Sequence, residues 1–286
     1  MRNLIMPMMA ALAFLLAGCD NFESHPYAAK IHGDTDIIAK NVAEIEAMQL
    51  KPPFKFAFLT DTQDAYNELE DAVREIRSRG DIAFVVHGGD MTDFGLPKEF
   101  VWCRDIMQTC GVPYVPVIGN HDCLGNGEQT YRYIFGTDNY SFNAGPVHFV
   151  MLNTIALEYD YSHPVPDFTF LTSDCEAVNA LNAAAPGTVT HTVAVMHSRP
   201  FDEQFNNNVV QPFNYYLEQF PGMKNADPGA GTVTHGFCLC GHNHSFQAAD
   251  LFDNGIIYWQ CANTGKRQYF VITITDTGYE VEKIDF

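Results

Sequence analysis

The stretch FKFAFLTDTQ, at residues 54–63, decides which fold the sequence predicts. Its apolar run, Phe54–Thr60, has the length of a buried strand and ends abruptly in polar side chains. The same pattern returns in IAFVVHGGD at residues 82–90 and in YVPVIGNHD at residues 114–122. The gaps between the three runs show helical periodicity, over residues 65–79 and 98–109. Strands that alternate with helices predict an α/β core with partly parallel strand pairing.

The second half of the chain is richer in expected strands. A hairpin is expected over residues 140–153, followed by a helix over 174–185. Six more strands are expected, the last four as one antiparallel run: 192–196, 236–239, 246–251, 256–260, 269–275 and 279–284. The long polar and aromatic segment between His197 and His242 is expected to serve function. Because no repeat and no linker divides the chain, we expect one domain over residues 53–286.

Composition excludes several classes of protein. Apolar residues make up 47% and charged residues 18% of the chain, which excludes general disorder and fibrous folds. Asp and Glu number 35 against 16 Lys and Arg, so the formal net charge is −19. A negative field repels phosphate backbones, and a nucleic-acid polymer is therefore a poor partner. An anionic substrate needs local positive charge, which metal ions would supply to an acidic protein.

The N-terminus has the pattern of a secretory signal. A single arginine precedes a continuous apolar run over residues 4–17, which is shorter than the ~20 residues that a helix needs to cross a bilayer. The motif LAGC at residues 16–19 resembles the lipobox of bacterial lipoproteins, where cleavage precedes a cysteine that carries diacylglycerol. We therefore expect a signal peptide over residues 1–18 and a lipid on Cys19. That lipid would anchor the protein in the bacterial cell envelope, in the periplasm or at the outer-membrane surface.

Two points about the N-terminus stay open at this stage. An ordinary signal peptide with a coincidental cysteine is the alternative, and the membrane leaflet is undecided. Residues 19–52 are expected to form a tether between the anchor and the domain, closed by Pro52 and Pro53. One amphipathic stretch within it, residues 36–48, is expected to form a helix on the surface.

Seven cysteines remain besides Cys19, and an odd number cannot all pair within one chain. Cys238 and Cys240 are expected on one strand and on the same face, which is poor geometry for a disulfide. No CxxC pair occurs, so structural zinc is not expected. We expect buried thiols with at most one or two bridges, whose partners the sequence does not identify.

Side chains that can bind metals follow five of the expected strands. They belong to five short motifs: Asp61-Thr62-Gln63, Gly88-Gly89-Asp90, Gly119-Asn120-His121-Asp122, His197-Ser198 and Gly241-His242-Asn243-His244. The C-terminal ends of parallel strands meet at one edge of a sheet, where ligands bind. Each motif alone has an ordinary explanation as a turn or a helix cap. Five in succession, each at a strand end, predict one shared site.

The order D-x-Q, GGD, GNHD, H and GHNH resembles that of the calcineurin-like metallophosphoesterases, from residue 54 to the C-terminus. The resemblance implies a four-layer α/β/β/α sandwich with a dinuclear metal centre at its strand ends. Asp90 would bridge the two ions. The other implied ligands are Asp61, Gln63 and His244 at the first site, and Asn120, His197 and His242 at the second.

Two divalent ions are implied as cofactors. The mixed nitrogen and oxygen donors suit Mn, Fe or Zn, with Mg or Ni as alternatives. His121 resembles the histidine of the family that stabilises the phosphoryl charge and protonates the leaving oxygen. Asp93 resembles the carboxylate that orients this histidine, and the alternative is a turn residue before Phe94.

The function that follows is hydrolysis of a phosphomonoester or phosphodiester by a metal-bound hydroxide. A catalytically weakened or inactive lipoprotein that acts as a binding or scaffold protein is the alternative, because the family usually has histidine where Gln63 stands. A third possibility keeps the metals but hydrolyses an amide or a pyrophosphate. Two other side chains stay open: His87 lies either behind the site or in the core, and Arg199 either holds a phosphate oxygen or forms an ion pair. The residues in the loops that are expected to rim the site are Tyr159, Tyr161, His163, Arg199, Phe201, Tyr215 and Tyr216.

The lipobox generates the first test. Wild-type protein is expected to enter the detergent phase and to take up labelled palmitate, because a diacylglyceryl thioether with an added N-acyl chain anchors stably. Cys19→Ser, which removes only the acceptor sulfur, is expected to do neither. A mutant that partitions like wild type would rule out the anchor on Cys19.

Overall fold

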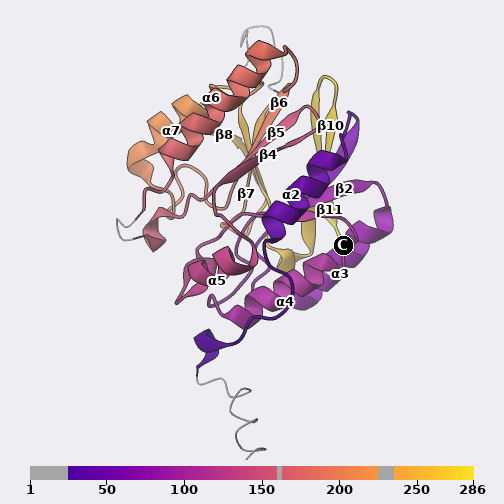
Figure 1. The fold of residues 1–286 in the computed structure, drawn as a ribbon, viewed down its shortest axis with the longest axis vertical. Helices are drawn as coiled ribbons and strands as arrows, with labels where there is room; N and C mark the ends of the chain where they lie inside the picture. Colours follow the sequence, from indigo (N-terminus) through magenta and orange to yellow (C-terminus); the bar gives the residue numbers. More distant parts are fainter. Residues whose placement is uncertain (1–24, 160–162, 225–234) are drawn as a thin grey trace, which may run out of the picture.

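The computed structural model describes residues 25–159, 163–224 and 235–286, which form two β-sheets with helices on their outer faces (Figure 1). The expected signal peptide, 1–18, and Cys19 lie outside the described residues. Within the described ranges, no helix is both long enough and apolar enough to cross a bilayer.

The first sheet carries the strands of the opening α/β pattern. Its spatial order is β11-β10-β1-β2-β3. The strands are β1 (Phe54–Leu59), β2 (Ile82–His87), β3 (Tyr114–Pro116), β10 (Gln268–Thr275) and β11 (Gly278–Asp285). Strands β1, β2 and β3 are parallel, as predicted, and β10 is antiparallel to β1.

The second sheet has the order β4-β5-β6-β7-β9-β8. Its strands are β4 (Tyr140–Ala144), β5 (Val147–Leu152), β6 (His191–Met196), β7 (Phe237–Cys240), β8 (Gln247–Asp250) and β9 (Ile257–Gln260). Strands β5, β6, β7 and β9 are parallel. The C-terminal ends of these strands therefore meet at one edge.

The prediction that the last four strands form one antiparallel run is wrong. β8 and β9 pair in the second sheet, whereas β10 and β11 pair in the first. The chain changes sheets between β9 and β10, where the amide of Thr264 donates to the carbonyls of Thr60 and Asp61. Alternating polarity identifies a strand, but it does not identify the strand beside which it lies.

Helices cover both outer faces, which confirms the four-layer α/β/β/α sandwich. Helices α3 (Tyr66–Arg79) and α4 (Pro97–Gln108) pack on the first sheet, and α6 (Phe168–Ala184) and α7 (Val210–Leu217) pack on the second. Helix α7 falls inside the segment between His197 and His242. The sequence did not predict it.

Helix α6 begins at residue 168 rather than at 174. The side chain of Asp167 accepts hydrogen bonds from the amides of Thr169 and Phe170, and this N-cap sets the start. One further α-helix that the sequence did not predict is α5 (Gly127–Ile134). Short 3-10 turns complete the described chain: η2 (Pro26–Ala28), η3 (His121–Cys123), η4 (Ala156–Glu158), η5 (Asn207–Val209) and η7 (Thr264–Lys266).

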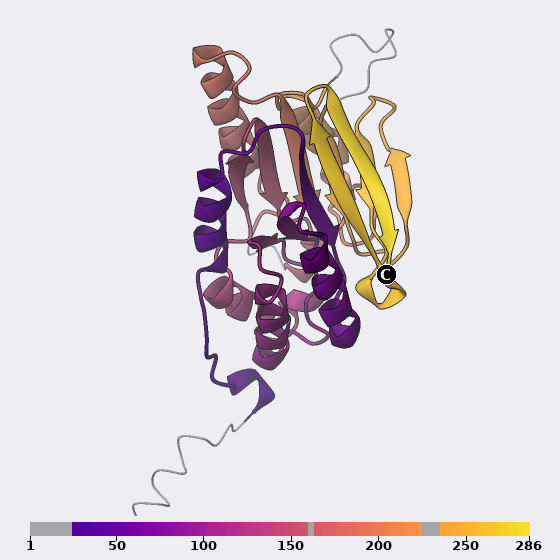
Figure 2. The same cartoon turned by 90° about the vertical axis from the view of Figure 1, so that its right-hand side faces the viewer.

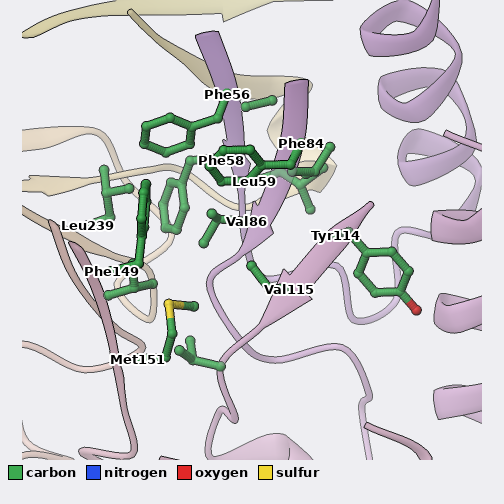
Figure 3. Close-up of a cluster of buried hydrophobic side chains, with 14 of the residues drawn as sticks. Phe56, Phe58, Leu59, Phe84, Val86, Tyr114, Val115, Phe149, Met151 and Leu239 are labelled. Atoms are coloured by element: carbon green, nitrogen blue, oxygen red, sulfur yellow. The ribbon is translucent and has the colours of Figure 1, made fainter. Parts of the chain in front are cut away.

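An aromatic layer joins the two sheets (Figure 3). Phe56 of β1 and Phe84 of β2 stack with ring centroids 5.1 Å apart. Phe142 of β4 and Phe149 of β5 stack at 4.9 Å in the opposite sheet. Phe149 meets both Phe56 and Phe84 edge to face, at 5.2 and 5.5 Å. Such pairs add about 0.5–1.5 kcal/mol each beyond their buried area, so the layer holds the two sheets in register.

Helix α2 (Ile37–Ala47) closes the seam between the two sheets, lying against both edge strands, β3 and β4. The Asn41 side-chain amide donates to the Tyr114 carbonyl at 2.7 Å, and the Asn143 amide donates to the Glu46 carboxylate at 3.2 Å. The predicted helix is therefore present, but its inner face is part of the domain core rather than of a free tether (Figure 2, indigo). Covering the edge strands also blocks pairing with another chain.

The seven cysteines of the described chain are all free. Six are buried, and Cys123 is half-buried. Burial raises the pKa of the Cys103 thiol to about 12 and that of the Cys110 thiol to about 11, so both stay protonated and unreactive. The one or two bridges that the sequence allowed do not form.

The position of α2 generates a stability test. Ile45, which is fully buried, faces the core from this helix. Ile45→Ala should lower the free energy of unfolding by about 2–4 kcal/mol, because a cavity opens where both sheets meet the helix. Urea denaturation followed by circular dichroism measures the change.

The matched control is the neighbouring exposed residue Glu44. Glu44→Ala should leave the stability within about 0.5 kcal/mol of wild type. Equal stability of the two variants would mean that residues 37–47 are a surface appendage after all.

Candidate metal centre

Two groups of metal-capable side chains form at the C-terminal edge of both sheets, and Asp90 belongs to each. Asp90, His197 and His242 place one ligand atom each within 4.8 Å of one another. Asp61, Asp90 and His244 do the same. Since Asp61 and Asp90 follow strands of the first sheet and the histidines follow strands of the second, the site exists only where the two sheets meet.

Asn120 and Gln63 complete these two groups. The Asn120 Oδ1 lies 3.2 Å from His197 Nε2 and 3.1 Å from His242 Nδ1. The Gln63 Nε2 lies 3.3 Å from Asp90 Oδ2 and 3.4 Å from His244 Nε2. The structure therefore brings together all seven side chains that the sequence analysis assigned as ligands, and their binding of metal stays a prediction.

The chemistry of this donor set fits divalent cations. Asp61 and Asp90 are at most 1% exposed, so two carboxylates lie buried side by side. The Gln63 Oε1 is also buried, and no hydrogen-bond donor of the described chain reaches it. Buried polar atoms are rarely left without partners, and a cation would satisfy both the orphan oxygen and the paired negative charges. Oxygen and imidazole nitrogen donors without thiolate suit Mn, Fe or Zn.

His197 is the most tightly held histidine of the site. Its Nδ1 donates to the Gly88 carbonyl at 2.8 Å, which directs Nε2 toward Asp90 Oδ2 at 3.2 Å. Burial disfavours the charged ring, but the Asp90 carboxylate outweighs it and raises the pKa of His197 to about 10. The fixed tautomer presents Nε2 as the atom available to a metal once its proton leaves.

The pKa values of His244 and His242 are shifted in opposite directions by their surroundings. A hydrogen bond to the Asp61 carboxylate raises the pKa of His244, whose side chain is 43% exposed. Burial, with the neighbouring His197 ring, lowers the pKa of His242. The exposed carboxylate of Glu203 lies 3.9 Å from His242 Nε2, and no sequence motif had marked it.

Four of the residues that are predicted to be ligands have left-handed backbone conformations. The φ angles are 53° for Asp61, 55° for Asp90, 71° for His242 and 52° for His244. Residues with side chains rarely adopt this region, and each instance stores on the order of 1 kcal/mol that the surrounding contacts must offset. Strain at four of the predicted ligands favours a functional role for this edge.

The glycines of the motifs make room for the carboxylates. A Cβ at Gly119 would lie 2.1 Å from Asp90 Oδ1, and one at Gly241 would lie 2.5 Å from Asp61 Oδ2. Main-chain amides that follow these glycines bind the same carboxylates. His121 N donates to Asp90 Oδ1 at 2.9 Å, and His242 N donates to Asp61 Oδ2 at 3.1 Å. Each buried carboxylate is thus held by a loop other than its own.

Asp122 is a structural residue of the site that the sequence analysis left without a role. Its Oδ1 accepts from the amides of Met91 and Thr92 at 2.9 and 3.0 Å, and its Oδ2 accepts from the Gly119 amide at 3.0 Å. Burial and the Asp90 carboxylate raise the pKa of Asp122 to about 7. The only sequence signal was its place in the GNHD motif, where an acceptor can join the loops after β2 and β3.

The expected pairing of His121 with Asp93 is present through a different atom. His121 Nδ1 donates to the main-chain carbonyl of Asp93 at 2.8 Å, not to its carboxylate. Burial and the Asp64 carboxylate raise the pKa of Asp93. The expectation that the Asp93 carboxylate orients the ring is therefore corrected: the turn places a carbonyl there, and any residue could supply it.

Contacts describe the two side chains whose roles the sequence left open, His87 and Arg199. His87 is fully buried, with Nε2 3.1 Å from Thr62 Oγ1, and burial lowers its pKa to about 3, so it is a neutral core histidine. Arg199 contacts the Gln247 amide oxygen and lies 3.6 Å from the Asp202 carboxylate. Arg199 therefore forms an ion pair, but its buried Nε and Nη1 have no hydrogen-bond partner among the described residues, and its contact with a phosphate oxygen stays a prediction.

A hollow of about 800 Å³ is bordered by the loops that follow β5 and β6. Tyr159 and His163, two of the residues expected at the rim of the site, line it together with Leu157 and residues 205–208. A third, Tyr161, lies outside the described residues. No lysine or arginine of the described chain lines the hollow.

Comparisons with known proteins agree with this geometry. A family model described as calcineurin-like phosphoesterase matches residues 54–268. A search of curated proteins found no match.

Three solved structures share the fold. A dimetal phosphatase from Danio rerio is 13% identical, with 82% of this chain and 100% of that chain covered and a TM-score of 0.55. The purple acid phosphatase PPD1 from yellow lupin is 12% identical, with 83% and 52% covered and a TM-score of 0.60. TT1561 of Thermus thermophilus is 11% identical, with 80% and 98% covered and a TM-score of 0.52.

Asp122 generates a test of how the site is built. Asp122→Ala leaves the amides of Met91, Thr92 and Gly119 buried without an acceptor, and should lower the free energy of unfolding by about 2–4 kcal/mol. Urea denaturation in the presence of a chelator separates this loss from any effect of metal.

Asp122→Asn is the matched control, since it keeps the shape and one acceptor oxygen. It should fall between wild type and Asp122→Ala. An alanine variant as stable as wild type would show that Asp122 does not join the two loops.

Proposed function

The chain belongs to the calcineurin-like phosphoesterases, and on this basis we propose that it hydrolyses phosphoester bonds with two divalent metal ions. One arrangement supports this proposal above the others: two groups of ligand atoms share the single carboxylate of Asp90. A shared carboxylate places two cations side by side, the geometry that clamps a phosphoryl group.

The ions would be held at two unequal sites. The first consists of Asp61, Gln63, Asp90 and His244, and the second of Asp90, Asn120, His197 and His242. Bound there, the cations would supply positive charge to the phosphoryl oxygens and acidify a water molecule. His244 is 43% exposed whereas His197 is fully buried, and an amide oxygen is a weaker donor than imidazole. The first site therefore binds its ion less tightly and favours Mn²⁺ or Mg²⁺ more than the second does.

His121 is the proton donor of the proposed reaction. Because its Nδ1–H is committed to the Asp93 carbonyl, Nε2 is the nitrogen that exchanges a proton with the substrate. In the imidazolium form, Nε2–H donates to the leaving oxygen. A half-buried histidine fixed in this way, without a duty as a ligand, favours an active enzyme over the scaffold alternative.

The acid–base and ligand chemistry is the same for monoesters and diesters. The hollow between the loops after β5 and β6 is large enough for a leaving group of drug size, and its described lining offers amides and aromatic rings rather than lysine or arginine. A leaving group without a second phosphate fits this lining. The proposed partner of the enzyme besides its substrate is the membrane, through a lipid on Cys19 in the bacterial cell envelope.

The test is turnover of p-nitrophenyl phosphate and bis-p-nitrophenyl phosphate with added Mn²⁺. Asp90→Asn should abolish turnover and lower the metal content of purified protein, because one carboxylate serves both ions. Mass spectrometry of bound metals and release of p-nitrophenol give the two readouts.

His121→Ala separates catalysis from metal binding. It should retain the metals and lower kcat by about 10²–10⁴-fold, which is the usual contribution of a general acid. His32→Ala, which removes an exposed imidazole, is the control and should match wild type. Loss of metal in His121→Ala would show that His121 is a ligand, and no turnover by metal-loaded wild type would favour the scaffold alternative.

A further inference from the structure

Residues 25–34, here called the strap, lie along helix α4 instead of hanging free. Arg104 of α4 is only 2% exposed, and its guanidinium donates to the carbonyls of His32 and Asp34 at 2.7 and 3.0 Å. Gln108, one turn further along, donates to the Asp34 carboxylate at 2.9 Å. A buried guanidinium satisfied by main-chain carbonyls fixes the strap firmly to the domain.

The far end of the strap lies at the metal-centre edge. The Tyr27 hydroxyl donates to the Phe94 carbonyl at 3.1 Å, and the Asn126 amide donates to the Tyr27 carbonyl at 3.1 Å. Phe94 directly follows Asp93, whose carbonyl holds the His121 ring. Figure 1 shows this end of the strap, η2, at the same end of the molecule as α5, with α6 extending to the opposite end.

Because the strap is attached to the domain, it shortens the chain that can extend between a lipid on Cys19 and the domain. A free tether over residues 19–52 would reach ~110 Å when extended, and the domain could then take any orientation. The stretch from Cys19 to His25 reaches at most ~20 Å. A domain of this size is about 45 Å across, so the strapped edge stays near the membrane while the opposite end stays away.

We infer that the strap turns the metal-centre edge of the protein toward the membrane that carries the Cys19 lipid. The inference rests on the proposed lipid anchor and not on turnover. Phe94 and Leu124, which are 61% and 37% exposed, lie at this edge and provide its contact with the lipid surface. The two residues are neighbours, because a Cβ at Gly95 would meet the Leu124 carbonyl. Exposed apolar side chains of this kind favour the boundary between headgroups and acyl chains.

Single tryptophans report the orientation. The chain has two, Trp102 and Trp259, and both are replaced by Phe in the full-length, lipidated protein. Phe94→Trp then places one indole at the metal-centre edge, and Leu181→Trp places one on α6. Leu181 is 40% exposed, against 61% for Phe94, and lies near the C-terminal end of α6, so both reporters are exposed and lie at opposite ends of the molecule.

The proteins are reconstituted on vesicles whose phospholipids carry bromine in the upper acyl chain. Fluorescence of the reporter at position 94 should fall by about two-fold, whereas that of the reporter at 181 should not change. Equal quenching of the two reporters on floated vesicles overturns the orientation. Failure of the wild-type chain to float overturns the anchor on which the inference rests, and neither result depends on phosphoesterase activity.

Lengthening the chain between anchor and strap tests the reach directly. Inserting twenty Gly and Ser residues between Phe22 and Glu23 adds about 70 Å of extended chain and leaves the strap contacts in place. Quenching of the reporter at 94 should then fall to the level of the reporter at 181. Undiminished quenching in this variant would overturn the role of the short segment.

Discussion

The burial of Asp90 is the constraint on which the site depends. This carboxylate is 1% exposed at the junction of two sheets, where an unpaired negative charge would cost several kcal/mol. Its partners come from separate parts of the chain: the His121 amide, the His197 ring and the Gln63 side chain. The loops after β1, β2, β3 and β6 must therefore meet around one residue, and a displaced loop would leave the charge uncompensated.

The other features of the edge follow from bringing these loops so close together. Four of the predicted ligands take left-handed conformations, and glycines stand where any side chain would collide with a carboxylate. Asp122 then fastens two of the loops by their amides. Strain of this kind persists only on a rigid support, which the aromatic layer between the sheets and helix α2 along their open seam provide.

The N-terminal segment links this support to the surroundings of the protein. Residues before the first strand could have been a flexible connection, yet Arg104 and Tyr27 fix them along α4 and beside the turn that holds His121. The same segment continues into α2, which covers the edges of both sheets. The place at which the described chain begins, at residue 25, and the cover of both sheet edges thus depend on one stretch of about twenty residues.

The periodicity of the sequence was sufficient to identify most strands and the helices α3 and α4, because these elements bury one face each. Helices α5 and α7 were missed, since the first is short and the second lies in a polar segment whose apolar face appears only against the second sheet. The prediction that strands β8, β9, β10 and β11 pair in one antiparallel run was wrong for a related reason. Alternation records burial, but the partner of each strand depends on the edges that the rest of the fold leaves available.

By itself, the sequence determined which side chains meet, because polar residues placed after parallel strands can only gather at one edge. Tertiary structure alone decided how they meet. Asp93 contacts the His121 ring through its main-chain carbonyl, Asp122 accepts from three main-chain amides, and Arg199 forms an ion pair with Asp202. The type of a residue determines which groups its atoms can bind. The partner that an atom actually contacts depends on distances of a few tenths of an ångström, and these are set by segments far apart in the chain.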